Sequence, residues 1–359
     1  MIDRTTTEQS STTPQVSVII PARNEEASLG SCLQSLVTQT GVDFEIIVVN
    51  DHSTDRTSEI AASFARVRVI EAGPLPRGWT GKNNAVTAAS RVARGSWLLF
   101  TDADTVHLPG SLARAFAEAK EHHADLLSYS PEQIAVTFWE MAVLPVIFAE
   151  LACQYPPSKV SDPDSSEAAA NGQYILITRE AYDAVGGHAS VATSILEDVA
   201  LARAVKASGR KIRFRYAADA VRARMYRNFR QLREGWTKNL ALLFPNPGRL
   251  AAKTLLLWSL PWIVVCLKIA GLFTAAAWYG IALAALCFQT FRIARAKFRL
   301  SMTLLGAIFG MPMFAYLLLR SKRAHAQGRV SWKGRTYEGT EPPVSNNIKR
   351  TSLTPGKLA

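Results

Sequence analysis

Apolar residues follow two different spacings along the first two hundred residues of the chain. Continuous apolar runs predict buried strands, and apolar residues three or four positions apart predict amphipathic helices. Predicted strands cover residues 16–20, 44–49, 67–70, 97–100 and 174–177. Predicted helices begin near Leu29, Ser58, Asn83 and Asp198. Because strands that alternate with helices need crossover connections, the pattern predicts an α/β domain with a mostly parallel sheet.

Two long apolar runs follow this domain. Residues 255–291 contain one charged residue, Lys268, and residues 300–319 contain none. A single helix over the first run would be about 55 Å long, against a membrane hydrocarbon core of about 30 Å. The first run therefore predicts two membrane-spanning helices with a turn near Gly271.

The second apolar run is less regular. It contains three residues that disturb helices, Gly306, Gly310 and Pro312. These residues favour a re-entrant hairpin, and a third full span is the alternative. Basic residues lie between the two runs at positions 292, 295, 297 and 299. Their positive charge predicts that this linker lies in the cytoplasm.

The segment 134–153 is apolar but carries Glu140 and Glu150. Its pattern fits an amphipathic helix at a membrane surface and, equally well, a buried core helix. Residues 155–167 are rich in Pro, Ser and Asp and predict a loop. We therefore expect four parts: a disordered tail at 1–14, a cytoplasmic catalytic domain at 15–250, a membrane region at 251–320, and a basic cytoplasmic or disordered tail at 321–359.

Composition narrows the class of protein. The formal net charge is +12, and the basic residues crowd the second half of the chain beside the apolar runs. This placement favours anionic lipid headgroups over nucleic acid as the partner. The first fourteen residues lack the apolar core of a signal peptide, so we expect the catalytic domain on the cytoplasmic side of the inner membrane. The four cysteines show no CxxC spacing, which predicts reduced thiols and no zinc site.

Polar residues gather where the predicted strands end. The first strand runs into Pro21, Arg23, Asn24 and Glu25, and the second runs into Asp51. Ligands of α/β sheets bind at these carboxyl ends. The motifs therefore predict a cradle for a nucleoside, in which Asp51 accepts a hydrogen bond from the base or the ribose. The alternative is that Asn24 and the neighbouring hydroxyl residues are only helix caps.

Asp102 and Asp104 follow the strand at 97–100. Two carboxylates one residue apart after a buried strand can present oxygens to one hard divalent cation. The pair therefore predicts a Mg²⁺ or Mn²⁺ site that holds the diphosphate of a nucleotide-sugar. Lys82 begins a helix after a glycine-containing turn and is a candidate contact to phosphate or sugar. An ordinary solvated lysine is the alternative.

Two further groups of candidate residues come later in the chain. Glu197 and Asp198 begin a helix, where carboxylates serve either as caps or as the general base that takes a hydroxyl proton. Gln231, Arg233 and Trp236 lie on a basic helix ahead of the membrane region. They belong either to a lipid-facing stripe or to the acceptor side of a site.

In this order the motifs resemble glycosyltransferase family 2, whose members are inverting enzymes with the GT-A fold. The resemblance covers residues 16–236 and implies a Rossmann-like, mostly parallel sheet, followed here by C-terminal transmembrane helices. It also implies a role for each motif: a uridine site at residues 21–25 and Asp51, metal ligands at Asp102 and Asp104, and a base at Asp198.

Three segments place the chain within the family. Residues 74–82 and 136–140 look like the branch associated with hopanoid and carotenoid glycosylation. Residues 231–236 look like a loose Gln-x-x-Arg-Trp element in which Gly235 replaces the arginine, and this departure disfavours processive polymer synthesis. The resemblance implies a hexosyltransferase that moves a sugar from a nucleotide-sugar, expected to be UDP-linked, to a lipid-like acceptor of the hopanoid, carotenoid or polyprenyl type.

Two other functions fit parts of the pattern. The same fold class includes nucleotidyltransferases, but the chain has no glycine-rich basic loop after the first strand. A non-catalytic membrane scaffold would leave the acidic residues at the strand ends without a purpose.

Overall fold

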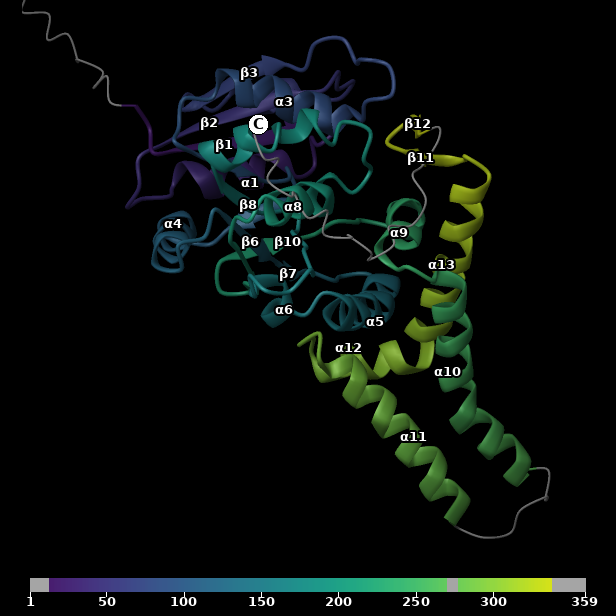
Figure 1. The fold of residues 1–359 in the computed structure, drawn as a ribbon. Helices are drawn as coiled ribbons and strands as arrows, with labels where there is room; N and C mark the ends of the chain where they lie inside the picture. Colours follow the sequence, from purple (N-terminus) through teal and green to yellow (C-terminus); the bar gives the residue numbers. More distant parts are fainter. Residues whose placement is uncertain (1–12, 270–276, 338–359) are drawn as a thin grey trace, which may run out of the picture. The chain divides into compact units, whose positions relative to one another are not determined.

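The computed structural model describes residues 13–269 and 277–337, and the chain divides into two compact units (Figure 1). The first unit contains residues up to 134 and residues 169–225, and the second contains residues 135–168 and those from 226 onward. Of the tails predicted at 1–14 and 321–359, residues 1–12 and 338–359 lie outside the described residues, as does the predicted turn near Gly271. Residues 321–337 of the second tail are not disordered, because they belong to a helix and a hairpin. The predicted boundary at residue 250, between a catalytic domain and a membrane region, stays a prediction.

A seven-stranded sheet forms the centre of the first unit, in the order β3-β2-β1-β4-β8-β6-β9. Its strands are β1 (Val16–Ala22), β2 (Phe44–Asn50), β3 (Val67–Glu71), β4 (Trp97–Phe100), β6 (Leu126–Ser130), β8 (Ile175–Thr178) and β9 (Ile212–Tyr216). Strands β3, β2, β1 and β4 are parallel to one another, and only β8 runs antiparallel to its neighbours among these described strands. The predicted mostly parallel α/β sheet is confirmed.

Helices connect these strands, and the four that were predicted, α1, α2, α3 and α8, begin within two residues of their predicted starts. They are α1 (Leu29–Val37), α2 (Thr57–Ala62), α3 (Gly81–Val92), α4 (Ser111–Glu121), α7 (Arg179–Ala184), the 3-10 turn η1 (Gly187–Ala189) and α8 (Glu197–Ala207). A small sheet, in the order β5-β10-β7, adds β5 (Thr105–His107), β10 (Val221–Ala223) and β7 (Glu132–Gln133). The sequence pattern did not predict the small sheet, nor β6, β9, α4 and α7.

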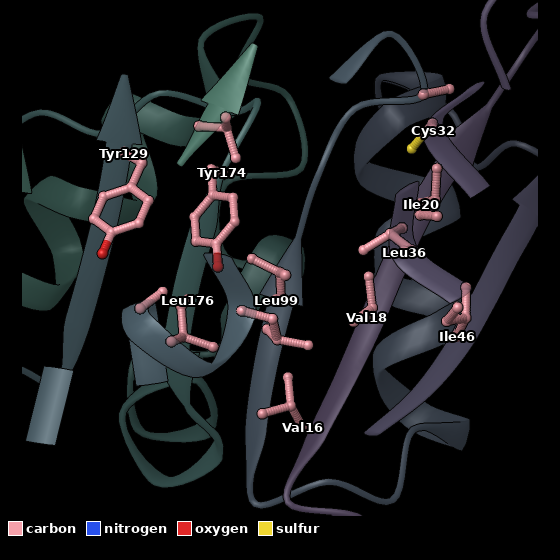
Figure 2. Close-up of a cluster of buried hydrophobic side chains, with 14 of the residues drawn as sticks. Val16, Val18, Ile20, Cys32, Leu36, Ile46, Leu99, Tyr129, Tyr174 and Leu176 are labelled. Atoms are coloured by element: carbon pink, nitrogen blue, oxygen red, sulfur yellow. The ribbon is translucent and has the colours of Figure 1, made fainter. Parts of the chain in front are cut away.

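One cluster of buried side chains holds the strands of the first unit in place (Figure 2). Every second residue of β1, at Val16, Val18 and Ile20, belongs to it, as does Leu36 of α1. Burial of each large aliphatic side chain contributes about 1.5–3 kcal/mol. Cys32 is also in the cluster, and burial raises the pKa of its thiol, so the thiol stays protonated. All four cysteines are free, as predicted.

The second unit is mostly helical. Its elements are α5 (Phe138–Gln154), α6 (Pro157–Ser161), α9 (Phe229–Leu243), α10 (Pro247–Ile269), α11 (Ala277–Ala294), α12 (Leu300–Leu305), the π-helix η2 (Gly306–Gly310), α13 (Met311–Ala326), β11 (Val330–Trp332) and β12 (Arg335–Tyr337). The predicted loop at 155–167 contains the short helix α6, which has a proline in its first turn. Residues 330–337 form a hairpin.

Helix α5 is a buried helix of this unit. Most of its residues from Glu140 to Ala149 are buried, and it packs against η2, α11 and α12. A Cβ atom on Gly310 would lie 2.0 Å from the Ala142 carbonyl oxygen, so only glycine allows this approach. Of the two interpretations of the apolar segment 134–153, the structure therefore favours a packed helix.

Two helices are long and apolar enough to cross a membrane, at Pro247–Leu267 and Leu300–Ala326, and a shorter apolar helix lies at Tyr279–Ala294. The predicted hairpin around Gly306 and Gly310 differs from what the structure contains. The chain stays helical from Leu300 to Ala326 and bends at the π-helix (Figure 1). The reason is that the two glycines lie against the backbone of α5, where they permit close packing and do not reverse the chain.

Candidate active site

The loops after β1 and β2 are joined by hydrogen bonds. The Asn24 backbone N–H donates to Ser53 Oγ at 3.1 Å, and the Thr54 N–H donates to Asn24 Oδ1 at 2.8 Å. Asn24 and His52 have φ angles of 52° and 55°, in the left-handed region. Asn24 therefore joins two strand ends and does not serve as a helix cap, and the paired loops form a fixed rim at the carboxyl edge of the sheet.

Asp51 is at the base of this rim and is 4% exposed. Its backbone N–H donates to the Ala22 carbonyl at 2.8 Å, and Arg23 Nη1 donates to the Asp51 carbonyl at 2.9 Å. The Asp51 carboxylate lies 3.4 Å from His52 Nδ1. The predicted residues of the nucleoside cradle, from Pro21 to Glu25 and Asp51, thus lie at two adjacent strand ends.

Lys82 lies among carboxylates at the start of α3. Its ammonium is 2.7 Å from Asp102 Oδ1 and 2.7 Å from Glu197 Oε1. Burial opposes the charged form of Lys82, but Asp102 and Glu197 outweigh it and raise the pKa of this lysine well above its usual value. A charged ammonium therefore joins the end of β4 to the start of α8. This residue is not a solvated surface lysine, although its side chain is 33% exposed.

Asn83, next to Lys82, ties the loop before α8 to α3. Its side-chain Nδ2 lies 2.9–3.1 Å from the carbonyl oxygens of Val191, Ala192 and Ser194. The Thr80 N–H also donates to the Ala192 carbonyl, at 2.9 Å. These bonds hold Glu197 and Asp198 in a fixed position beside Lys82.

Both carboxylate oxygens of Asp198 are held by backbone amides. The Gly172 N–H donates to Oδ2 at 2.8 Å, and the Val199 N–H donates to Oδ1 at 2.8 Å. Burial raises the pKa of Asp198 to about 6, with the Glu197 charge adding to this effect and the Lys82 charge opposing it. A carboxylate with this pKa is ionised at neutral pH and more basic than an exposed aspartate.

The Asp102–Asp104 pair fits a divalent cation that takes some of its ligands from the protein and the others from a substrate and water. Both residues are half-buried at the end of β4, and Gln173 Nε2 lies 3.5 Å from Asp104 Oδ1. Mg²⁺ sites often take one or two carboxylates and fill the remaining positions with phosphate oxygens and water. Within residues 13–269 and 277–337, no group of three or more His, Cys, Asp or Glu side chains is arranged to hold a metal. Asp102 and Asp104 alone could supply only the carboxylate part of such a site.

A small pocket brings together Pro21, Lys82, Asp102, Glu197 and Asp198. The other predicted residues of the donor and metal sites do not line it: Arg23, Asn24, Glu25, Asp51 and Asp104. Its lining consists of Pro21, Lys82, Val86, Phe100, Thr101, Asp102, Gly172, Ile175, His188, Glu197 and Asp198. The sequence motifs missed Gly172 and His188. The only local signals for them are the dipeptide Asn171-Gly172 and the Gly-Gly-His sequence that ends at His188.

The predicted acceptor-side residues belong to the second unit. Trp236 is 2% exposed and packs against Phe148 and Tyr226, with ring centroids 6.2 and 6.1 Å away. The Gln231 side chain accepts a hydrogen bond from the Arg227 backbone N–H at 2.8 Å. Their contribution to acceptor binding, with that of Arg233, stays a prediction.

The chain is similar in sequence to known proteins. Residues 17–163 match the family model described as Glycosyl transferase family 2. A relative from Staphylococcus aureus (strain USA300), 4,4'-diaponeurosporenoate glycosyltransferase, is 31% identical over 238 residues, which is 63% of this chain and 60% of the relative. Identical figures hold for the same enzyme of strain NCTC 8325 / PS 47. The chain thus spans about 60% of the length of these curated relatives.

A solved structure agrees with the fold. The mannosyltransferase PcManGT from Pyrobaculum calidifontis, in complex with GDP-Man and Mn2+, aligns with a TM-score of 0.52 and 17% identity. The alignment covers 88% of this chain and 87% of that chain. These findings confirm two predictions from the sequence: the GT-A fold, and the resemblance to glycosyltransferase family 2 with its carotenoid-associated branch.

Proposed function

We propose that the chain is an inverting, metal-dependent glycosyltransferase that moves a sugar from a UDP-linked donor to a lipid-like acceptor in a membrane. The observation that carries the proposal is the Asp198 carboxylate, which two backbone amides orient beside the Lys82–Asp102–Glu197 cluster. Sugar transfer as the reaction class is supported by the similarity to glycosyltransferase family 2 and to 4,4'-diaponeurosporenoate glycosyltransferase.

Asp198 is the general base of the proposed reaction. The acceptor hydroxyl gives its proton to Asp198 while its oxygen bonds to the anomeric carbon of the sugar. The bond from that carbon to the diphosphate oxygen breaks on the opposite face, and its electron pair leaves with the nucleoside diphosphate. A single displacement of this kind inverts the anomeric centre. The pKa of about 6 keeps Asp198 deprotonated at neutral pH and basic enough to accept the proton.

Lys82 and Glu197 support the base without taking the proton. The ammonium of Lys82 is paired with Glu197 and opposes the effect of the Glu197 charge, which would otherwise disfavour ionisation of Asp198. The amides of Gly172 and Val199 fix the direction of the carboxylate before a substrate binds. A carboxylate that is already oriented lowers the activation barrier, because no free energy is needed to orient it during the reaction.

Asp102 and Asp104 would hold a Mg²⁺ or Mn²⁺ ion together with the donor diphosphate. When bound, such an ion offsets the negative charge that grows on the departing nucleoside diphosphate. The nucleoside would lie on the rim formed by the loops after β1 and β2, where Asp51 accepts a hydrogen bond from the base or the ribose. Because hydrogen bonds already join these loops, little ordering is needed when the donor binds.

A membrane-dissolved acceptor fits the second unit. Large apolar side chains on α10 and α11 are exposed, among them Leu256 at 61%, Leu283 at 62% and Phe291 at 67%. Exposed apolar surface of this extent on long helices is expected to face lipid. The basic residues after α11 support a cytoplasmic position for the linker, and we propose the same side of the membrane for the catalytic unit.

The proposal is tested with membranes that contain the full chain. They are incubated with labelled UDP-glucose, UDP-N-acetylglucosamine or GDP-mannose and Mn²⁺, and the extracted lipids are weighed by mass spectrometry. We expect one lipid to gain the mass of a sugar residue, with release of nucleoside diphosphate. Release of pyrophosphate would instead indicate a nucleotidyltransferase. Absence of any donor turnover across the panel, also with lipid extracts of several bacteria as acceptors, would contradict the proposal.

A further inference from the structure

His188 is a buried side chain of the pocket that the proposed mechanism does not use. It lies in η1, is 2% exposed, and contacts the Phe100 ring edge-on, with ring centroids 4.6 Å apart. Gly187 makes room for this arrangement, since its φ is +54° and a Cβ there would lie 2.5 Å from the Tyr182 ring. The histidine lines the same pocket as Lys82 and Asp198.

Tyr182 determines which nitrogen of His188 carries the proton. The Tyr182 hydroxyl oxygen accepts the His188 backbone N–H at 3.0 Å and lies 3.0 Å from Nδ1. The hydroxyl proton goes either to Nδ1 or to Ser90 Oγ, which is 3.4 Å away. The shorter distance favours Nδ1. Nδ1 is then an acceptor, so the ring proton is on Nε2.

The ring of His188 is neutral, and its second nitrogen is available. Burial lowers the pKa of His188 to about 4, with the Glu197 charge opposing this effect and the Lys82 charge adding to it. Among the described residues, Nε2 has no hydrogen-bond partner, whereas Nδ1 has Tyr182. A donor that lines a pocket and has no protein partner can bond to a ligand there. The pocket therefore offers an uncharged donor beside its charged cluster.

We propose that His188 recognises the transferred sugar, with Nε2–H donating a hydrogen bond to a sugar hydroxyl or ring oxygen. The assignment rests on the proposed function, because it requires a nucleotide-sugar in this pocket. The charged groups of the site suit the diphosphate and the metal ion, but a sugar ring is uncharged. A neutral donor held by Tyr182 and Phe100 suits a hydroxyl group without attracting the diphosphate.

Two substitutions separate the functions of the two ring nitrogens. His188→Asn keeps an acceptor near the position of Nδ1 for Tyr182 but removes the donor at the position of Nε2. His188→Gln places an amide N–H near the position of Nε2. The full chain in detergent is titrated calorimetrically, with Mn²⁺ present, against UDP-glucose, UDP-N-acetylglucosamine and GDP-mannose. UDP and GDP serve as ligands without the sugar, and Tm is measured for each variant.

For His188→Asn we expect the Kd of the preferred nucleotide-sugar to rise about tenfold, because the variant loses one hydrogen bond to the sugar. The Kd of the matching nucleoside diphosphate should stay within about twofold, and His188→Gln should recover most of the loss. Equal weakening of both ligands, or no change in either, would overturn the assignment. If the unaltered chain binds no nucleotide-sugar, the proposed function itself has failed, and the assignment fails with it.

Discussion

Gly172 donates its backbone N–H to Asp198 Oδ2 at 2.8 Å, and no side chain could be added at this glycine without disturbing the contact. A Cβ there would lie 3.3 Å from Asp198 Oδ2 and 3.0 Å from Lys82 Nζ. The glycine thus orients the base and leaves space for the lysine. Its backbone conformation lies outside the left-handed region, so the requirement for glycine is one of space.

Gly172→Ala is expected to lower kcat about tenfold with little change in Tm. The end of the Lys82 side chain can move by a few tenths of an ångström to make room for the added methyl group. This movement changes the free energy of unfolding little, but it shifts the charges around the base. The matched control is Gly30→Ala, whose Cβ would meet Ile60 Cγ2 at an ordinary 3.8 Å. Steady-state kinetics and thermal unfolding of both variants test this. A large fall in Tm with unchanged kcat would show that Gly172 serves the fold alone.

Asp198→Asn should reduce transfer by about 10²- to 10⁴-fold, the range for loss of a general base. The asparagine can still accept the Gly172 N–H, so the Kd of the nucleotide-sugar should change little. Asp219→Asn is the control, since Asp219 pairs with Arg215, is 62% exposed and lines no part of the pocket. Unchanged turnover in Asp198→Asn would remove Asp198 from the role of base.

The pH dependence of kcat follows from the same carboxyl. Asp198 acts as a base only when deprotonated, and burial raises its pKa to about 6. Activity should therefore be level above about pH 7 and fall tenfold per pH unit well below pH 6. A rate profile from pH 4.5 to 8.5, with the extent of folding checked at each pH, measures the midpoint. A midpoint near that of an exposed aspartate would contradict the assignment.

Lys82→Met is expected to move this midpoint upward. Lys82 lowers the pKa of Asp198, so removing the ammonium leaves Asp198 beside the uncompensated charge of Glu197. The pH profile of Lys82→Met should then reach its half-maximum at a higher pH, whereas Lys82→Arg, which keeps the charge, should shift it less. A downward shift would mean that Lys82 acts mainly through another group.

Asp104→Asn should raise the Mn²⁺ concentration needed for half-maximal activity by about tenfold or more, because one of two anionic ligands is lost. The measurement begins with chain treated with EDTA, to which Mn²⁺ is added back. Asp164→Asn, a change in the surface loop 155–167, provides the comparison. Full activity of the EDTA-treated chain without added metal would contradict the proposed metal dependence.

The sequence predicted those parts of the fold whose pattern is strong and local. The runs that became β1, β2 and β4 are largely apolar, so their strands and the polar residues after them could be placed correctly. Helix α4 was missed because its buried positions include one large apolar residue, Leu112, beside the small Ala115 and Ala119, so no apolar run marks the helix.

The candidate site was predictable only in part. Acidic residues at the ends of strands or the starts of helices, such as Asp102 and Asp198, can be recognised in the sequence by their type and position. The pairing of Lys82 with Glu197 joins segments far apart in the chain, and spacing carries no information about it. Gly172 and His188 matter through what they touch, a carboxylate and a tyrosine, and these contacts exist only in the folded chain.

The hydrogen bonds of Asn83 have a consequence for protein engineering. Its amide binds the carbonyls of Val191, Ala192 and Ser194, so the segment ahead of α8 takes its shape from a residue at the start of α3. A chimaera that imports residues 186–198 from a related enzyme would need the matching amide at position 83. In recombination between homologues, these two segments should therefore be taken from the same parent sequence.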